Sequence, residues 1–212
     1  MKRTRIRFAD HFRVKHGYAF KSEHFADEGP FALLTPGNFN EEGGFRNRGG
    51  KQPYYTGDVP PAYILAKGDV IIAMTEQDYG LLGSSVWVPS SDYYLHNQRL
   101  GLIVDLNEKR LNKRFLYYLF NTREVRHQIA GSASGTKVRH TAPERVGRVE
   151  AEIPDIKVQE RIADTLTAYD DLMENNRRRM ALLEESARLL YREWFVHLRY
   201  HERMKDEGGR MK

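Results

Sequence analysis

The 212-residue sequence contains no cysteine and no long apolar run. The absence of cysteine excludes disulfides, thiolate zinc sites and cysteine nucleophiles, and it is typical of proteins in a reducing compartment. The first segment, MKRTRIRFADHF, is charged and no apolar stretch follows it, so we expect neither a signal peptide nor a transmembrane helix. We therefore expect a soluble, cytoplasmic protein.

Glycine and proline are both absent from residues 158–199. Apolar side chains recur there at alternating steps of four and three residues, which is the spacing of a coiled-coil seam. The seam consists of Ile162, Leu166, Tyr169, Met173, Asn176, Met180, Leu183, Ala187, Leu190 and Trp194. We predict one long coiled-coil helix over residues 154–200 that serves for dimerisation. The alternative is an ordinary helix on a domain core, which would show a wider apolar stripe.

The length and the one polar position of this seam carry further expectations. At a rise of about 1.5 Å per residue the helix would span roughly 60 Å, so it would also act as a spacer. Asn176 is polar among apolar seam residues, and such a residue fixes register and pairing. Residues 201–212, HERMKDEGGRMK, are rich in charge and are expected to form a flexible tail.

Residues 1–153 have a different character, because turn signals such as TPGN, VPP and KGD interrupt them repeatedly. Short β-branched or apolar runs between these turns predict strands at 31–34, 70–73, 85–88 and 100–104. Asn112 is a candidate cap for a helix over KRFLYYLFNTREVRHQI that ends at Gly131. We predict an α+β protein, with a small mixed α/β domain followed by the long helix.

The loop GSASGTKVRH, residues 131–140, resembles a nucleotide-binding loop but lacks its spacing. A P-loop requires a lysine directly after the second glycine and a hydroxyl residue after the lysine, whereas here Thr136 precedes Lys137. The loop still offers backbone N–H groups and cations to a phosphodiester. The alternative is a solvated surface loop without a ligand.

No other segment predicts catalysis or a cofactor. DVPPAY at 58–63 differs from a methyltransferase catalytic loop by an inserted valine and an alanine. His197 and His201 have the spacing of two metal ligands but no third ligand beside them. Asp170 and Asp171 lie within the predicted helix, where a solvated face explains them. We expect no enzyme, no bound cofactor and no metal.

Four loops combine cations, amides and aromatic side chains: residues 45–55, 75–80, 90–99 and 131–140. Arginine and lysine pair with guanine, asparagine and glutamine pair with adenine, and hydroxyl groups contact phosphates. The net charge of +5 also favours a polyanionic partner. The candidate DNA-binding residues are Arg46, Arg48, Lys51, Gln52, Gln77, Tyr79, Asn97, Gln98, Arg99, Thr136, Lys137, Arg139 and His140.

Three segments in this order, HGYAFKSEHF (16–25), LAKGDVIIAMT (65–75) and the run from Ser134 to Met173, resemble the specificity subunit of type I restriction-modification systems. The resemblance implies a non-catalytic subunit with a target-recognition domain. It also implies double-stranded DNA and methyltransferase subunits as partners, with restriction subunits joining when DNA is cleaved. S-adenosylmethionine would then be bound by the methyltransferase subunit, which modifies adenine.

One departure from that family concerns size, because its usual members carry two recognition domains and two long helices. This chain has one of each, so it is either a natural half-subunit that self-associates or a truncated product. Two copies paired through antiparallel helices would restore an assembly with two recognition domains, which binds a bipartite DNA site. The rival hypothesis is a coiled-coil adaptor that binds proteins without reading DNA.

Overall fold

The computed structural model describes residues 3–77 and 80–199. It divides into a first unit that ends at Ala163 and a second unit that begins at Asp164. The first unit is a mixed α/β domain and the second is helical, so the predicted α+β class is confirmed.

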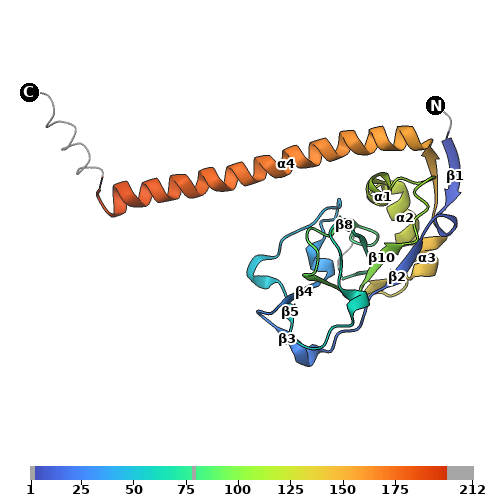
Figure 1. Ribbon diagram of the computed structural model, residues 1–212, viewed down its shortest axis with the longest axis horizontal. Helices are drawn as coiled ribbons and strands as arrows, with labels where there is room; N and C mark the ends of the chain where they lie inside the picture. Colours follow the sequence, from blue (N-terminus) through green and yellow to red (C-terminus); the bar gives the residue numbers. More distant parts are fainter. Residues whose placement is uncertain (1–2, 78–79, 200–212) are drawn as a thin grey trace, which may run out of the picture. The chain divides into compact units, whose positions relative to one another are not determined.

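The described residues of the first unit form four small sheets (Figure 1). One is antiparallel with the order β2-β10-β6-β8, formed by β2 (Arg13–His16), β10 (Leu100–Val104), β6 (Val70–Ala73) and β8 (Ser85–Trp87). The next has the order β3-β5-β4-β9, formed by β3 (Phe25–Ala26), β5 (Tyr54–Tyr55), β4 (Phe31–Leu34) and β9 (Tyr94–His96). Two pairs complete the set: β1 (Arg3–Arg7) with β12 (Glu150–Pro154), and β7 (Thr75–Glu76) with β11 (Arg139–His140).

The strands predicted at 31–34, 70–73 and 100–104 are confirmed, and the one predicted at 85–88 ends a residue earlier. All four residues of β6 are buried, as expected for the central apolar run of a sheet. Single 3-10 turns join several strands: η1 (Phe8–Asp10), η2 (Ser22–His24), η3 (Pro36–Asn38), η4 (Gly49–Lys51) and η5 (Pro61–Tyr63).

The single helix predicted after Asn112 is wrong in one respect, because the segment forms two helices, α1 (Lys113–Phe120) and α2 (Arg123–Gly131). Asn112 does cap α1, since its side chain accepts the N–H groups of Arg114 and Phe115. The break arises because Asn121 turns its amide to Ser85 and Thr122 caps α2 by accepting the N–H of Val125. A further short helix, α3, covers Pro143–Gly147.

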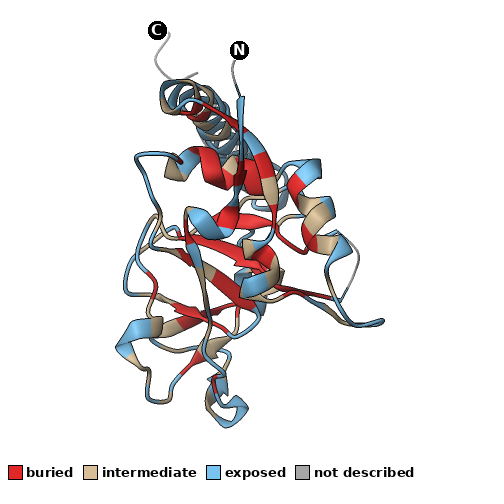
Figure 2. Cartoon of the chain, turned by 90° about the vertical axis from the view of Figure 1, so that its right-hand side faces the viewer, coloured by how far each residue is buried: buried red, intermediate tan, exposed pale blue. Residues whose placement is uncertain are grey.

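The main core lies between the helices and the sheets of the first unit (Figure 2). Phe8, Phe12 and Phe120 form its aromatic centre, with ring centroids 5.1 to 5.8 Å apart. A second cluster packs Leu34 and Leu65 against the other face of β6. β6 is therefore covered on both faces, and the loops that follow the strands start from a rigid base.

The long helix α4 (Ile156–Tyr191) begins in the first unit. Asp155 accepts the N–H of Val158 at its start. Gln159 and Ala163 are fully buried, and Ile162 packs against the main core. Ile162, predicted for the seam, therefore belongs to the domain in this structure.

The remainder of α4, in the second unit, carries eight of the other nine predicted seam residues, and Trp194 lies in the turn that follows the helix. All nine are exposed. Tyr169 keeps 62% of its surface and Leu183 keeps 69%. The helix was predicted to continue to residue 200, but α4 ends at Tyr191 and a π-helical turn follows over Arg192–Val196, where His197 donates its N–H to the carbonyl of Arg192. The predicted tail at 201–212 lies outside the described residues. Within the described part of the chain, no helix is both long and apolar enough to cross a membrane.

Candidate nucleic-acid interface

Strand pairing brings three distant loops to one end of the domain. β4 and β9 run parallel, with Leu34 opposite His96, so Thr35 and Asn97 leave the sheet at the same end. Leu100 lies opposite Ala73, so the residues after β6 adjoin the turn before β10. We call this end the recognition edge and define it by Thr35, Arg46, Arg48, Gln77, Gln98 and Arg99.

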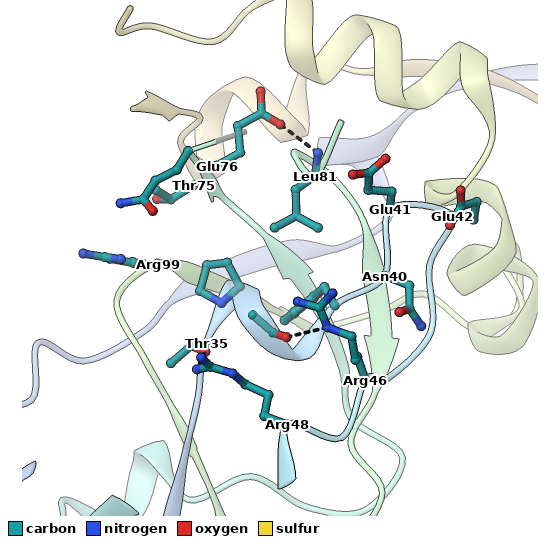
Figure 3. A pocket seen from close by; sticks show the side chains of 14 residues that line it. Thr35, Asn40, Glu41, Glu42, Arg46, Arg48, Thr75, Glu76, Leu81 and Arg99 are labelled. Carbon is teal, nitrogen blue, oxygen red and sulfur yellow. Dashed lines mark hydrogen bonds between the residues drawn. The ribbon is translucent and has the colours of Figure 1, made fainter. Parts of the chain in front are cut away.

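The recognition edge surrounds a cleft of about 640 Å³, to which Thr35, Arg46, Arg48, Gln77 and Arg99 all contribute. Figure 3 shows the three arginines in the lower part of this cleft, below Glu41, Glu42 and Glu76. Four of the sequence-predicted DNA-binding residues therefore come together, although up to 53 positions separate them, from 46 to 99.

The arginines of the cleft keep most of their hydrogen-bond donors available. Arg46 donates from Nε to the Gly37 carbonyl at 3.1 Å, and Arg48 donates from Nη1 to the Thr35 hydroxyl at 3.3 Å. Within residues 3–77 and 80–199, none of Arg46, Arg48 and Arg99 forms an ion pair. Guanidinium groups with free donors on one cleft provide the geometry that phosphates and guanine edges accept.

Glu76, one of the acidic residues that line the cleft, is occupied by internal bonds. The buried Glu76 carboxylate accepts the N–H groups of Gly80, Leu81 and Leu82 through Oε2, and it pairs with Arg139 through Oε1 at 2.9 Å. Glu76 therefore holds in place the residues at which the loop that carries Gln77 ends.

Arg126 also holds the loop that carries Gln77 in place. Its guanidinium donates to the carbonyls of Leu82, Glu41 and Gly80. Burial lowers the pKa of Arg126, and the charges of Glu76, Glu41 and Glu42 oppose that shift. The loop is consequently held at both sides by charged groups.

A second cleft, of about 380 Å³, adjoins the first and shares Thr35 and Arg99 with it. Its wall is partly aromatic, with Phe20 and Phe25, and partly polar, with Asn97 and Gln98. The Gln98–Arg99 turn thus stands between an arginine-lined cleft and a partly apolar one.

The loop GSASGTKVRH forms a hairpin beside the recognition edge. Ser134 and His140 exchange backbone hydrogen bonds at 2.9 and 2.8 Å, and β11 pairs with β7 directly before Gln77. Gly135 has φ +100° and a Cβ there would lie 2.1 Å from the Val138 carbonyl oxygen, so the turn requires glycine. Thr136 and Lys137 are exposed at the tip.

Several of the predicted residues have internal roles in the structure. Gln52 is buried, donates to the Leu33 carbonyl at 2.8 Å and accepts the Asn38 amide at 2.7 Å. Arg139 pairs with Glu76, and the His140 ring lies 3.1 Å from the Thr75 hydroxyl. We therefore leave Gln52, Arg139 and His140 out of the proposed interface.

Of the other predicted residues, Lys51 lies outside the two clefts and Tyr79 outside the described part of the chain. Lys51 is exposed on η4. Thr35 and Glu76 were not predicted, although Thr35 opens the TPGN turn after a predicted strand, and binding residues are frequent in such loops. No local signal identifies Glu76, because its partner Arg139 is 63 positions away.

Comparisons with known proteins concern the family and the fold of the chain. Residues 5–185 match the family model described as type I restriction modification DNA specificity domain. Over 82 residues the chain is 30% identical to the type I restriction enzyme MjaIX specificity subunit of Methanocaldococcus jannaschii, covering 39% of this chain and 19% of that protein. Over 98 residues it is 33% identical to the HindI specificity subunit of Haemophilus influenzae, covering 45% and 21%.

The fold is similar to that of a solved type I restriction-modification S subunit from M. genitalium, with a TM-score of 0.59 and 18% identity. That match covers 82% of this chain and 41% of the other, so the chain spans less than half the length of its relatives. The family model covers most of the sequence, including the recognition edge and most of α4. The chain belongs to the type I restriction-modification DNA specificity domain family.

Proposed function

We propose that this chain reads DNA sequence for a type I restriction-modification system and performs no catalysis itself. The observation that carries the proposal is the gathering of Arg46, Arg48, Gln77 and Arg99 on one cleft in a chain of the DNA specificity family. Double-stranded DNA would lie against the recognition edge. Methyltransferase subunits, and restriction subunits where present, would be directed to the chosen site.

The exposed hairpin tip fits a phosphate contact beside that edge. Lys137 follows two small residues and a hydroxyl residue, and it is exposed next to the strand that leads to Gln77. A phosphate contact contributes affinity to every duplex and makes binding depend on salt. We expect Lys137 to position the domain without choosing a sequence.

Self-association through α4 would supply the second recognition domain. Leu166, Met173, Met180 and Leu190 are exposed at coiled-coil spacing, and burying one such side chain contributes about 1.5 to 3 kcal/mol. A second copy would bury these side chains against the same residues of its own helix. Antiparallel pairing would place Asn176 of one copy near Asn176 of the other. The reader would then be a symmetric dimer with a bipartite target.

Titration of fluorescent duplexes with the chain and its methyltransferase subunits tests the proposal. We expect affinity to fall steeply with salt, and Lys137→Ala to reduce the slope of log affinity against log salt by about one unit on any sequence. Methylome sequencing of a host carrying the genes should show one recurrent motif. Salt-independent binding together with an unmethylated genome would favour the adaptor hypothesis.

A further inference from the structure

The turn between β9 and β10 differs from the other loops of the recognition edge in how firmly it is held. We propose that Gln98 and Arg99 are the base-reading residues, and that Asn97, Gly17 and His96 are positioning residues that fix their turn. The inference rests on the proposed function and assigns roles within it. The sequence predicted Asn97 as a DNA contact, whereas this proposal makes it a positioning residue of the turn.

Asn97 closes the turn with its own backbone and side chain. The Leu100 N–H donates to the Asn97 carbonyl at 3.0 Å, and the Arg99 N–H donates to the Asn97 Oδ1 at 3.0 Å. Asn97 is 9% exposed whereas its two successors are exposed. Its amide oxygen is therefore used inside the turn, which orients the next two side chains outward.

The chain between β2 and η2 holds the turn from a second side. Gln98 donates its N–H to the Tyr18 carbonyl at 2.9 Å, and Gly17 donates its N–H to the Leu100 carbonyl at 3.2 Å. A Cβ on Gly17 would lie 1.9 Å from the Asn97 carbonyl oxygen. Glycine is required at this position because the two backbones approach so closely.

The ring of His96 holds the turn from its buried side. Its Nε2 lies 3.1 Å from the Leu100 carbonyl, to which it donates, and the ring is fully buried. Burial lowers the pKa of His96 to about 4, so the ring is neutral at physiological pH. Four neighbours, Gly17, Tyr18, His96 and Asn97, thus fix one short turn.

The side chains that this turn presents are free to bind a ligand. Within the described residues, neither the Gln98 amide nor the Arg99 guanidinium has a hydrogen-bond or ion-pair partner. Arg46 and Arg48 each already donate to the chain. Because the backbone of the turn is already fixed, binding orders only the two side chains, and their unpaired donors and acceptors are available to the ligand.

The chemistry of the two side chains defines what each would read. A guanidinium makes two parallel hydrogen bonds to O6 and N7 of guanine, and a carboxamide makes two to N6 and N7 of adenine. Because Gln98 and Arg99 are consecutive, we expect them to read neighbouring positions of one half of the target.

The test is methylome sequencing of hosts that express the chain with its own methyltransferase subunits, comparing the unaltered chain with Arg99→Lys and Gln98→Ala. Arg99→Lys keeps the charge but loses the two-pronged contact, so one guanine of the motif should become degenerate. Gln98→Ala should relax an adjacent adenine. In duplex titrations each loss of discrimination should be about 5- to 150-fold, with an unchanged salt slope for Arg99→Lys.

Asn97 and Arg7 supply the matched comparisons. Asn97→Ala should relax both positions at once, whereas Asn97→Asp, which keeps an acceptor oxygen, should retain the motif even though its charge weakens binding to every duplex. Arg7→Ala, on β1 and in neither cleft, should change nothing.

The outcomes separate the two proposals. An unaltered motif in Arg99→Lys and Gln98→Ala, while the parent chain gives a clear motif, would overturn the reading assignment and leave the proposed function intact. No motif from the parent chain would overturn both.

Discussion

The side-chain oxygen of Gln159, in the first turn of α4, accepts the backbone N–H of Asn112 at 2.9 Å. The same side chain donates to the carbonyls of Arg110 and Pro154. Because Asn112 caps α1, one buried amide joins the start of the long helix to the cap of another helix and to the end of β12.

Gln159→Leu should lower the free energy of unfolding by about 1 to 3 kcal/mol, because it leaves a buried N–H and two carbonyl groups unpaired. Chemical denaturation followed by tryptophan fluorescence measures the change. Glu160→Leu makes a comparable apolar substitution at the exposed neighbour and should have little effect. Equal effects of the two variants would mean that the Gln159 bonds add nothing to stability.

Glu76→Gln should destabilise the domain by about 3 kcal/mol, since it leaves the partly buried Arg139 without its counter-charge. Arg139→Met removes the other partner. The double variant should lose less than the sum of the two single losses, because the charges act on each other. A double-mutant cycle in urea gives the coupling energy, and strictly additive losses would contradict the pairing.

Stability should fall as the pH is lowered through the range from 6.5 to about 4. The His96 ring titrates near pH 6.5 in the unfolded chain and near 4 in the folded one, so between these values the unfolded state binds more protons. The contribution is complete above pH 6.5 and amounts to about 3 kcal/mol lost at the acidic end. Urea unfolding at several pH values measures it.

His96→Gln should flatten that dependence, because the side chain no longer titrates. His127→Gln changes an exposed histidine and should reproduce the parent curve. If the His96 variant and the parent lose stability in parallel, the acid sensitivity has another source.

Leu166→Asp combined with Leu183→Asp should convert a self-associated chain into monomers, because both residues lie on the proposed seam and are exposed in the single chain. Light scattering at micromolar concentration gives the mass. Ala168→Asp with Ala181→Asp places the same charges on exposed positions of α4 outside the seam, and this variant should keep the parent mass. A monomeric parent chain would refute self-association through the helix.

The sequence predicted those elements that depend on neighbours along the chain. β4, β6 and β10 were correctly bounded because apolar runs lie between turn residues, and the Asn112 cap was correct because its partners are two and three residues away. The division of α1 from α2 was missed because Asn121 bonds Ser85, 36 positions earlier.

The site was predictable in composition but not in arrangement. Loops rich in arginine and amides were evident, yet the parallel pairing of β4 with β9 that brings Thr35 beside Asn97 leaves no local pattern. For the same reason Gln52 looked like a DNA contact, whereas its amide lies inside the domain between Asn38 and Leu33.

The antiparallel pairing of β1 with β12 places Arg3 opposite Pro154 and Arg7 opposite Glu150. The intervening chain, including the whole recognition edge, therefore leaves and returns at one narrow neck. A segment with such a neck is interchangeable in principle: another recognition domain of different length and sequence could occupy the same two strands if it kept the backbone groups that bond Gln159 and an apolar surface for Ile162 and Ala163 of α4. On the proposed function, different parts of one polypeptide would then determine the DNA target and the assembly of subunits. The target could change while the assembly stayed constant.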